Sequence, residues 1–368
     1  MRFNEGVFDA HVHTHGGCGV DNYLRNGLDN LTASGLDGMN LLCVRHGKSV
    51  CITDAEALLL KALYPGRFTV YSDGTYDIPE FGTTGEDFKN QIKDFIDAGA
   101  DGLKMGDGEL GPGVPLDDPR VDPMFDLIEK TGFPVIYHVG SAVYMPPRRR
   151  FQKNKEGILA RFLGYDPARD EDLPENAGVH RTREQLEEQR AQIENLLKKH
   201  PKARITFPHM YFMSDDLDRL ADFLDRHPYV NVDLTPCPEI YYHLSKNPNR
   251  IREFFVEYQD RLIFGTDNTL EMSPIEGITN IRRFLESDET FFAPQYGFDI
   301  SGIAPLPPEV LRKIYRENFL RICDPKPFSP KKAAEYCDKL YETVRHFEEL
   351  SEANKEELLE VARRLRQM

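Results

Sequence analysis

The chain has 368 residues, enough for one large domain or two ordinary ones. Its net charge of −15 argues against nucleic acid or an anionic membrane as partner. The six cysteines form no C-x-x-C pair, and no stretch approaches the roughly 18 apolar residues of a membrane span. We therefore expect a cytoplasmic protein with reduced thiols that acts on a small molecule.

Short apolar, β-branched runs recur along the chain, with helical segments between them. They are read as strands at about 7–13, 38–44, 68–73, 101–106, 134–140, 203–209, 229–235 and 261–267. A βα unit takes about 30 residues, which is the spacing of most consecutive runs. The pattern predicts an α/β fold, and specifically a (β/α)8 TIM barrel. A doubly wound open sheet shares the alternation, but it would not draw ligands from most of its strands.

Two of the intervening helices carry clear start signals. One is predicted over 182–199, with Thr182 in the capping position and apolar residues at helical spacing. The next is predicted to open at Ser214, with acidic residues in its first turn and leucines along one face.

The interval between the fifth and sixth predicted strands is much longer than the usual spacing of about 30 residues, because these strands begin at 134 and 203. It leaves an insertion at about 141–180 on the rim, which serves either as a lid or specificity loop or as a solvated excursion. After a last barrel helix at about 308–321, the Pro-rich stretch P-K-P-F-S-P precedes a charged helical tail. We therefore expect a barrel over 1–323 and a C-terminal helical extension over 324–368. The extension packs on the barrel or on a second subunit of a homo-oligomer.

Metal-capable side chains stand at the carboxyl ends of several predicted strands. They are His11 and His13 in D-A-H-V-H, His138 in P-V-I-Y-H, His209 in I-T-F-P-H and Asp267 in L-I-F-G-T-D. Residues i and i+2 of a strand face the same side, so His11 and His13 reach one ion. One H-x-H is common by chance, but joint placement on the rim where TIM-barrel chemistry lies predicts a metal site. Zn²⁺ is the expected ion, and Mn²⁺, Fe²⁺ or Ni²⁺ suit the same donors.

Lys104 ends the fourth predicted strand in D-G-L-K-M. An ammonium facing a barrel interior is costly to bury unless it is paired or neutralised. Two readings stay open. Lys104 either pairs with Asp107, Glu109, Asp267 or a substrate anion, or it is carboxylated by CO₂ and its carbamate bridges two metal ions.

Three basic residues are candidates for substrate binding. Arg45 and His46 follow the second strand on the same rim, and Arg148 begins an arginine run in the insertion. The forked donors of arginine suit a carboxylate or phosphate. An exposed basic run is more often simply solvated surface.

The D-x-H-x-H motif, the histidines ending strands 5 and 6 and the aspartate ending strand 8 occur in one order over about 320 residues. In this the chain resembles the metal-dependent amidohydrolase superfamily. The stretch from H-M-Y-F-M-S-D-D-L through V-D-L-T-P to F-G-T-D is similar to its amidohydrolase-related (amidohydrolase 2) branch. That branch contains hydrolases, lactonases and nonoxidative decarboxylases acting on carboxylated small molecules.

The resemblance implies that His11, His13 and Asp267 hold the more buried metal. In binuclear members the strand-4 lysine is carboxylated and bridges, while His138 and His209 hold a second ion. In mononuclear members His138 joins the first metal, and His209 polarises the substrate or relays a proton. One ion or two are both compatible with these residues.

We expect a hydrolase that uses a metal-activated water on a small, anionic ester, lactone or amide-like substrate. Asp267 would take the proton of that water and deliver it to the leaving group. His209 or a second ion would stabilise the charge that develops on the attacked oxygen. The alternative enzyme is a nonoxidative decarboxylase with the same ligands. A structural zinc protein is disfavoured, because structural sites are normally closed and Cys-rich.

Overall fold

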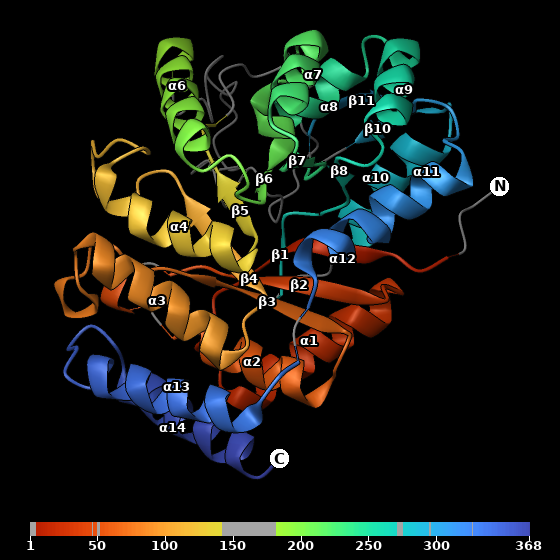
Figure 1. Cartoon of the computed structure of the whole chain (residues 1–368). Helices are drawn as coiled ribbons and strands as arrows, with labels where there is room; N and C mark the ends of the chain where they lie inside the picture. The colour runs from red at the N-terminus through yellow and green to blue at the C-terminus, as the bar shows by residue number, and fades with distance from the viewer. Residues whose placement is uncertain are drawn as a thin grey trace, which may run out of the picture.

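The computed structural model describes residues 5–45, 47–49, 52–141, 182–270, 275–293, 296–325 and 327–368. A curled parallel sheet of nine strands runs in the order β8-β7-β6-β5-β4-β3-β2-β1-β9 (Figure 1). The strands are β1 (Phe8–Thr14), β2 (Gly38–Cys43), β3 (Phe68–Asp73), β4 (Gly102–Gly106), β5 (Val135–His138), β6 (Ile205–Phe207), β7 (Val230–Asp233), β8 (Leu262–Ile263) and β9 (Asn268–Thr269). Each predicted strand overlaps an observed one, and the α/β TIM-barrel prediction is confirmed.

The barrel closes beside β1, where Ala10 N donates to Phe264 O, just after β8, at 3.1 Å. The short strand β9 pairs with β1 in parallel, opposite β2. Backbone bonds extend this pairing on both sides, because Asp267 N donates to His11 O at 3.0 Å and Leu270 N donates to His13 O at 2.8 Å. The first strand and the segment after β8 therefore close the barrel.

The single strand predicted over 261–267 is wrong in its second half. β8 ends at Ile263, and the next strand, β9, begins only at Asn268. Asp267 has a left-handed backbone with φ 57°, which a continuous strand does not allow. Gly265 passes so close to β1 that a Cβ there would lie 2.8 Å from the Cβ of His11. Because of this break, the chain passes close to β1 at Gly265, and the side chain of Asp267 turns towards His11 and His13.

Helices surround the sheet. They are α1 (Val20–Ser34), α2 (Thr53–Leu63), α3 (Gly85–Ala98), α4 (Asp122–Thr131), α6 (Arg183–Lys199), α7 (Leu217–Arg226), α8 (Pro238–Leu244), α9 (Pro248–Glu257), α10 (Ile275–Glu286), α11 (Pro308–Arg312) and α12 (Asn318–Cys323). A wider π-helical turn, Lys313–Glu317, joins the last two, and a hairpin of β10 (Thr290–Ala293) and β11 (Phe298–Ser301) follows α10.

The observed first residues of two helices can be compared with the starts predicted from the sequence. α6 begins as predicted, since the Thr182 side chain accepts a hydrogen bond from Gln185 N. The prediction that the next helix opens at Ser214 is wrong. Asp216 is the N-cap instead, because its carboxylate accepts from Arg219 N.

The amino-terminal end of the barrel is filled by aromatic side chains. Phe319 of α12 stacks on Phe8, the first residue of β1, with ring centroids 5.1 Å apart. Its ring also lies 6.1 Å from that of Tyr71 in β3. This plug leaves the opposite, carboxyl-terminal rim for polar side chains.

The C-terminal extension consists of α13 (Pro330–Val344) and α14 (Glu352–Arg366), which lie against α2 and α3 (Figure 1). The Tyr336 ring lies 6.1 Å from that of Phe95 in α3. Every residue of α2 from Thr53 to Ala62 is buried as a result. Of the two expected positions for the extension, the structure shows packing on the barrel.

No helix among the described residues is long and apolar enough to cross a membrane. The cysteines in the same part of the chain, Cys18, Cys43, Cys237, Cys323 and Cys337, form no disulfide with one another. Apart from Ser141, the insertion expected at about 141–180 lies outside the described residues.

Candidate metal centre

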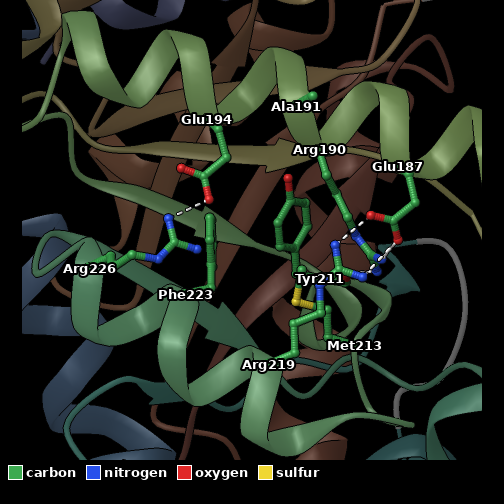
Figure 2. Close-up of a pocket in the computed structure, with 9 residues that line it drawn as sticks. All are labelled: Glu187, Arg190, Ala191, Glu194, Tyr211, Met213, Arg219, Phe223 and Arg226. Carbon is green, nitrogen blue, oxygen red and sulfur yellow. Dashed lines mark hydrogen bonds and ion pairs between the residues drawn. The ribbon is translucent and has the colours of Figure 1, made fainter.

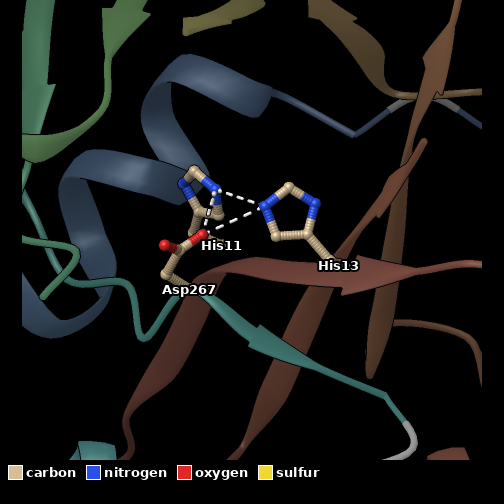
Figure 3. A group of neighbouring side chains, drawn as sticks. All are labelled: His11, His13 and Asp267. Atoms are coloured by element: carbon tan, nitrogen blue, oxygen red, sulfur yellow. Dashed lines mark hydrogen bonds and ion pairs between the residues drawn. The ribbon is translucent and has the colours of Figure 1, made fainter. Parts of the chain in front are cut away.

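Three of the predicted ligands converge where the barrel closes. His11 and His13 extend from β1, and Asp267 faces them from the break before β9 (Figure 3). The Nε2 atoms of the histidines are 3.2 Å apart, and Oδ1 of Asp267 lies 3.0 Å from His13 Nε2 and 3.3 Å from His11 Nε2. Their donor atoms all lie within 4.8 Å of one another, so one ion can contact all three.

Asp9, the first residue of the D-x-H-x-H motif, joins the two sides of this group. Its buried carboxylate accepts hydrogen bonds from His11 N at 3.1 Å and Thr266 N at 3.0 Å, and from the Thr266 hydroxyl at 2.6 Å. Burial raises the pKa of Asp9 to about 6, against the effect of these bonds. Asp9 thus fixes the residue next to Asp267 against β1.

A second carboxylate orients His11 from behind. Asp233, at the end of β7, has Oδ2 2.8 Å from His11 Nδ1, and both side chains are buried. Burial would lower the pKa of His11, but the charge and hydrogen bond of Asp233, followed by Asp267, raise it to about 9. An Nδ1–H that donates to Asp233 leaves the Nε2 lone pair facing the centre, the usual arrangement behind a metal-binding histidine.

His209 is fixed by the same strand end. Its backbone N–H lies 3.0 Å from Asp233 Oδ1 and 3.2 Å from Thr235 Oγ1. Its Nδ1 lies 3.2 Å from the carbonyl oxygen of Thr235, which can only accept, so Nδ1 carries the proton. With Nδ1 turned to this carbonyl, Nε2 faces the centre and lies 3.8 Å from Asp267 Oδ2.

His138 lies beside His209, with ring centroids 5.0 Å apart. Burial, and then the charge of His209, hold the pKa of His138 well below its usual range. Burial likewise lowers the pKa of His13 to about 4, despite the hydrogen bond to Asp267. Both imidazoles are neutral at pH 7, the form that binds a metal.

Lys104 is buried in the middle of β4, two residues before the strand ends, and its Nζ donates to Met105 O at 3.2 Å. Among the described residues, no ion pair joins Lys104 to Asp107, Glu109 or Asp267, the expected carboxylate partners. Its charge nevertheless opposes protonation of His13. The carbamate reading stays a prediction, and the simple salt-bridge reading has no support in this part of the chain.

Two further carboxyls lie within electrostatic reach of Lys104. Burial raises the pKa of Asp73 to about 7, although the Arg45 backbone N–H and the Lys104 charge oppose the rise. Burial and the charge of Asp73 raise the pKa of Glu109 well above its usual range, again against Lys104. The charge balance on this side of the barrel therefore depends on Lys104.

Of the basic residues expected to bind substrate, Arg45 is placed in the protein interior. Its side chain is only 3% exposed and bonds Asp54 Oδ2 at 2.7 Å, Thr75 Oγ1 at 2.8 Å and Tyr336 Oη at 2.8 Å. These contacts favour an internal role. His46 and Arg148 lie outside the described residues, so their assignment stays a prediction.

Asp9, Asp233 and Thr235 were not assigned a role from the sequence. Asp233 ends a strand in V-N-V-D, so the rule that singled out the histidines and Asp267 also applies to it. Asp9 and Thr235 carry no such signal, because their roles depend on partners that are distant in the sequence.

The donor set suits a divalent first-row metal. Two imidazoles and one carboxylate are ordinary catalytic ligands of Zn²⁺. Burial would raise the pKa of Asp267, but hydrogen bonds from His11 and His13 outweigh it and hold this pKa well below its usual range. The group thus combines one anionic oxygen and the neutral imidazole of His13 with His11, which gives up its Nε2 proton when it binds a metal.

A model of the amidohydrolase family matches residues 82–322, well over half of the chain. The chain therefore belongs to the amidohydrolase family, whose members are generally metal-dependent and include hydrolases and decarboxylases. The branch expected from the sequence is confirmed. A search of curated proteins gave no match.

Solved structures share the fold at low identity. An uncharacterised TIM-barrel protein from Bordetella bronchiseptica is 13% identical with a TM-score of 0.55, and the match covers 87% of this chain and 99% of that one. The 4-oxalomesaconate hydratase of Rhodopseudomonas palustris is 15% identical with a TM-score of 0.52, covering 91% and 99%. The 5-carboxyvanillate decarboxylase of Sphingomonas paucimobilis is 13% identical with a TM-score of 0.51, covering 88% and 100%.

Proposed function

We propose that the protein is a metal-dependent hydrolase of a small, anionic ester, lactone or amide-like molecule. The observation that carries the proposal is the ionised Asp267, whose two oxygens lie 3.0 Å from His13 Nε2 and 3.8 Å from His209 Nε2. A carboxylate held in this form at neutral pH can accept a proton from a water that attacks the substrate.

His11, His13 and Asp267 would hold the first ion, expected to be Zn²⁺. A bound divalent metal would lower the pKa of its water from 15.7 to about 7 and would polarise the carbonyl that this water attacks. His138 and His209 stand beside this group, with burial keeping His138 neutral and with Nε2 of His209 3.8 Å from Asp267 Oδ2. They would hold a second ion if one binds, and a carboxylated Lys104 would then supply a further anionic oxygen donor.

The protein supplies the proton path and the orientation. Asp267 takes the proton of the attacking water and returns it to the leaving group. Asp233 keeps His11 in one tautomer, and Thr235 does the same for His209. Neither ring has to rotate or exchange its proton during turnover, which keeps the donors preorganised.

The test is turnover by metal-free protein reconstituted with Zn²⁺ or Mn²⁺. A panel of anionic esters, lactones and amides is compared with a panel of aromatic carboxylic acids. We expect hydrolysis, and a loss of about 10²–10⁴ in rate for Asp267→Asn when metal content is matched. Release of CO₂ from the acids with no turnover of the first panel would refute hydrolysis and identify the nonoxidative decarboxylase.

A further inference from the structure

The chain leaves β6 through an unusual turn. His209, Met210, Tyr211 and Phe212 all have left-handed backbones, with φ of 55°, 50°, 56° and 49°. The turn is closed by hydrogen bonds from Tyr211 N to Pro208 O at 2.9 Å and from Met213 N to Met210 O at 3.1 Å. Non-glycine residues adopt this conformation singly, and a run of four is disfavoured at each position.

The side chains of the turn are all buried, which offsets the cost of its backbone. Tyr211 stacks on Phe207 with ring centroids 4.2 Å apart. Phe212 faces the metal centre, where its ring lies 5.2 Å from that of His209 and 6.0 Å from that of His138. The turn therefore sets the aromatic wall against which two candidate ligands pack.

Arg190 of α6 holds this turn from outside the barrel. Its Nη2 donates to Phe212 O at 2.7 Å and to Tyr211 O at 3.2 Å, and the residue is only 6% exposed. Its Nη1 pairs with Glu187 at 2.6 Å, and Glu187 also binds Arg219 of α7. These groups line a pocket of about 190 Å³ between α6 and α7, and Figure 2 shows Arg190 beside the Tyr211 ring.

We propose that Arg190 is a positioning residue of the metal centre, which acts by binding the two carbonyls of the left-handed turn. The guanidinium supplies donors to two carbonyls that lie outside a regular helix or strand, and it does so without contacting a candidate ligand. The inference rests on the proposed function in one respect only: that function is the reason why His138 and His209 have to be held in place.

The test compares Arg190→Met and Arg190→Lys with Arg219→Met. The first variant removes both carbonyl bonds and the pairing with Glu187. The second keeps a charge for Glu187 but lacks the fork that reaches two carbonyls. The third breaks the Glu187 bridge to α7 and leaves the carbonyl bonds intact, so it is the matched control.

Two readouts use the metal-free protein. Hydrogen exchange at the Tyr211 and Met213 amides should accelerate about ten- to hundredfold in Arg190→Met, as expected for loss of a charged hydrogen bond. The NMR signals of the His138 and His209 rings should shift with it. Arg190→Lys should lie between wild type and Arg190→Met, and Arg219→Met should match wild type. A third readout, metal affinity by chelator competition, should fall in the same order.

Unchanged exchange and ring signals in Arg190→Met would overturn the proposal. Acceleration that is equal at the β2 amides would also do so, because it would show global destabilisation. If Arg190→Met does not fold, the comparison of Arg190→Lys with Arg219→Met decides. None of these measurements involves turnover. A wild-type protein that hydrolyses nothing would therefore refute the proposed function and leave this inference standing.

Discussion

The Nδ1 atom of His11 lies 2.8 Å from Oδ2 of Asp233, with both side chains buried behind the metal centre. We expect Asp233→Asn to weaken metal binding about 10- to 100-fold, because the amide no longer enforces the tautomer that leaves Nε2 free. Chelator competition measures the change. The exposed Asp222→Asn on α7 is the control and should bind metal as wild type does. Equal affinities in all three proteins would contradict the role given to Asp233.

Lys104 decides between one metal and two. Metal content per chain should be measured in wild type and Lys104→Ala, both purified with bicarbonate. If a carbamate bridges two ions, we expect a fall from two ions per chain to one or fewer. Unchanged occupancy would remove Lys104 from the ligand set.

The extension contributes a buried hydroxyl to the barrel. Tyr336 Oη donates to Asp54 Oδ2 at 2.7 Å, and Arg45 Nη2 donates to Tyr336 Oη at 2.8 Å. Tyr336→Phe should lower the free energy of unfolding by about 1–3 kcal/mol, since a buried charged pair loses a partner. Urea unfolding measures this. Tyr341→Phe, on the same helix but half-buried, should change stability by less than about 0.5 kcal/mol, and a similar loss in both variants would argue against a specific hydroxyl effect.

Glu187 should make stability depend on pH in the acid range. The hydrogen bond from Arg219 lowers the pKa of Glu187 from 4.5 to about 2. The folded state therefore gains stability from this carboxylate above about pH 4.5, and the gain is lost as the pH falls towards 2. The pair is partly exposed, so the gain is at most about 1 kcal/mol.

Urea unfolding of wild type and Glu187→Gln at about pH 6.5 and pH 3.5 tests this linkage. The stability difference between the two proteins should shrink at the lower pH. A difference that is constant, or that grows on acidification, would show that the carboxylate charge is not what stabilises the pair.

The sequence was informative where structure is local. The alternation in D-A-H-V-H placed His11 and His13 on one face, and Thr182 marked the start of α6. The left-handed backbone of Asp267 could not be predicted, because it arises from contact with a strand some 250 residues earlier. Arg45 was read as a rim residue, since nothing near it in sequence shows that α13 contributes Tyr336 to cover it.

The turn after β6 was missed for a different reason. A left-handed run is normally signalled by glycine, and H-M-Y-F has none. Only the burial of these side chains and the bonds from Arg190 make the conformation tolerable. Both are long-range consequences of how α6 packs beside β6.

The pairing of β1 with β9 has a consequence for how the protein folds during synthesis. His11 and His13 are synthesised some 250 residues before Asp267. The three-donor group can therefore form only after this long intervening stretch has been made and the segment around Asp267 has docked beside β1. An ion bound there would then link β1 to the segment between β8 and β9. Without an ion the joint between β1 and this segment depends on the β1–β9 pairing and on the bonds of Asp9, so metal should slow proteolysis at this joint more than elsewhere in the barrel.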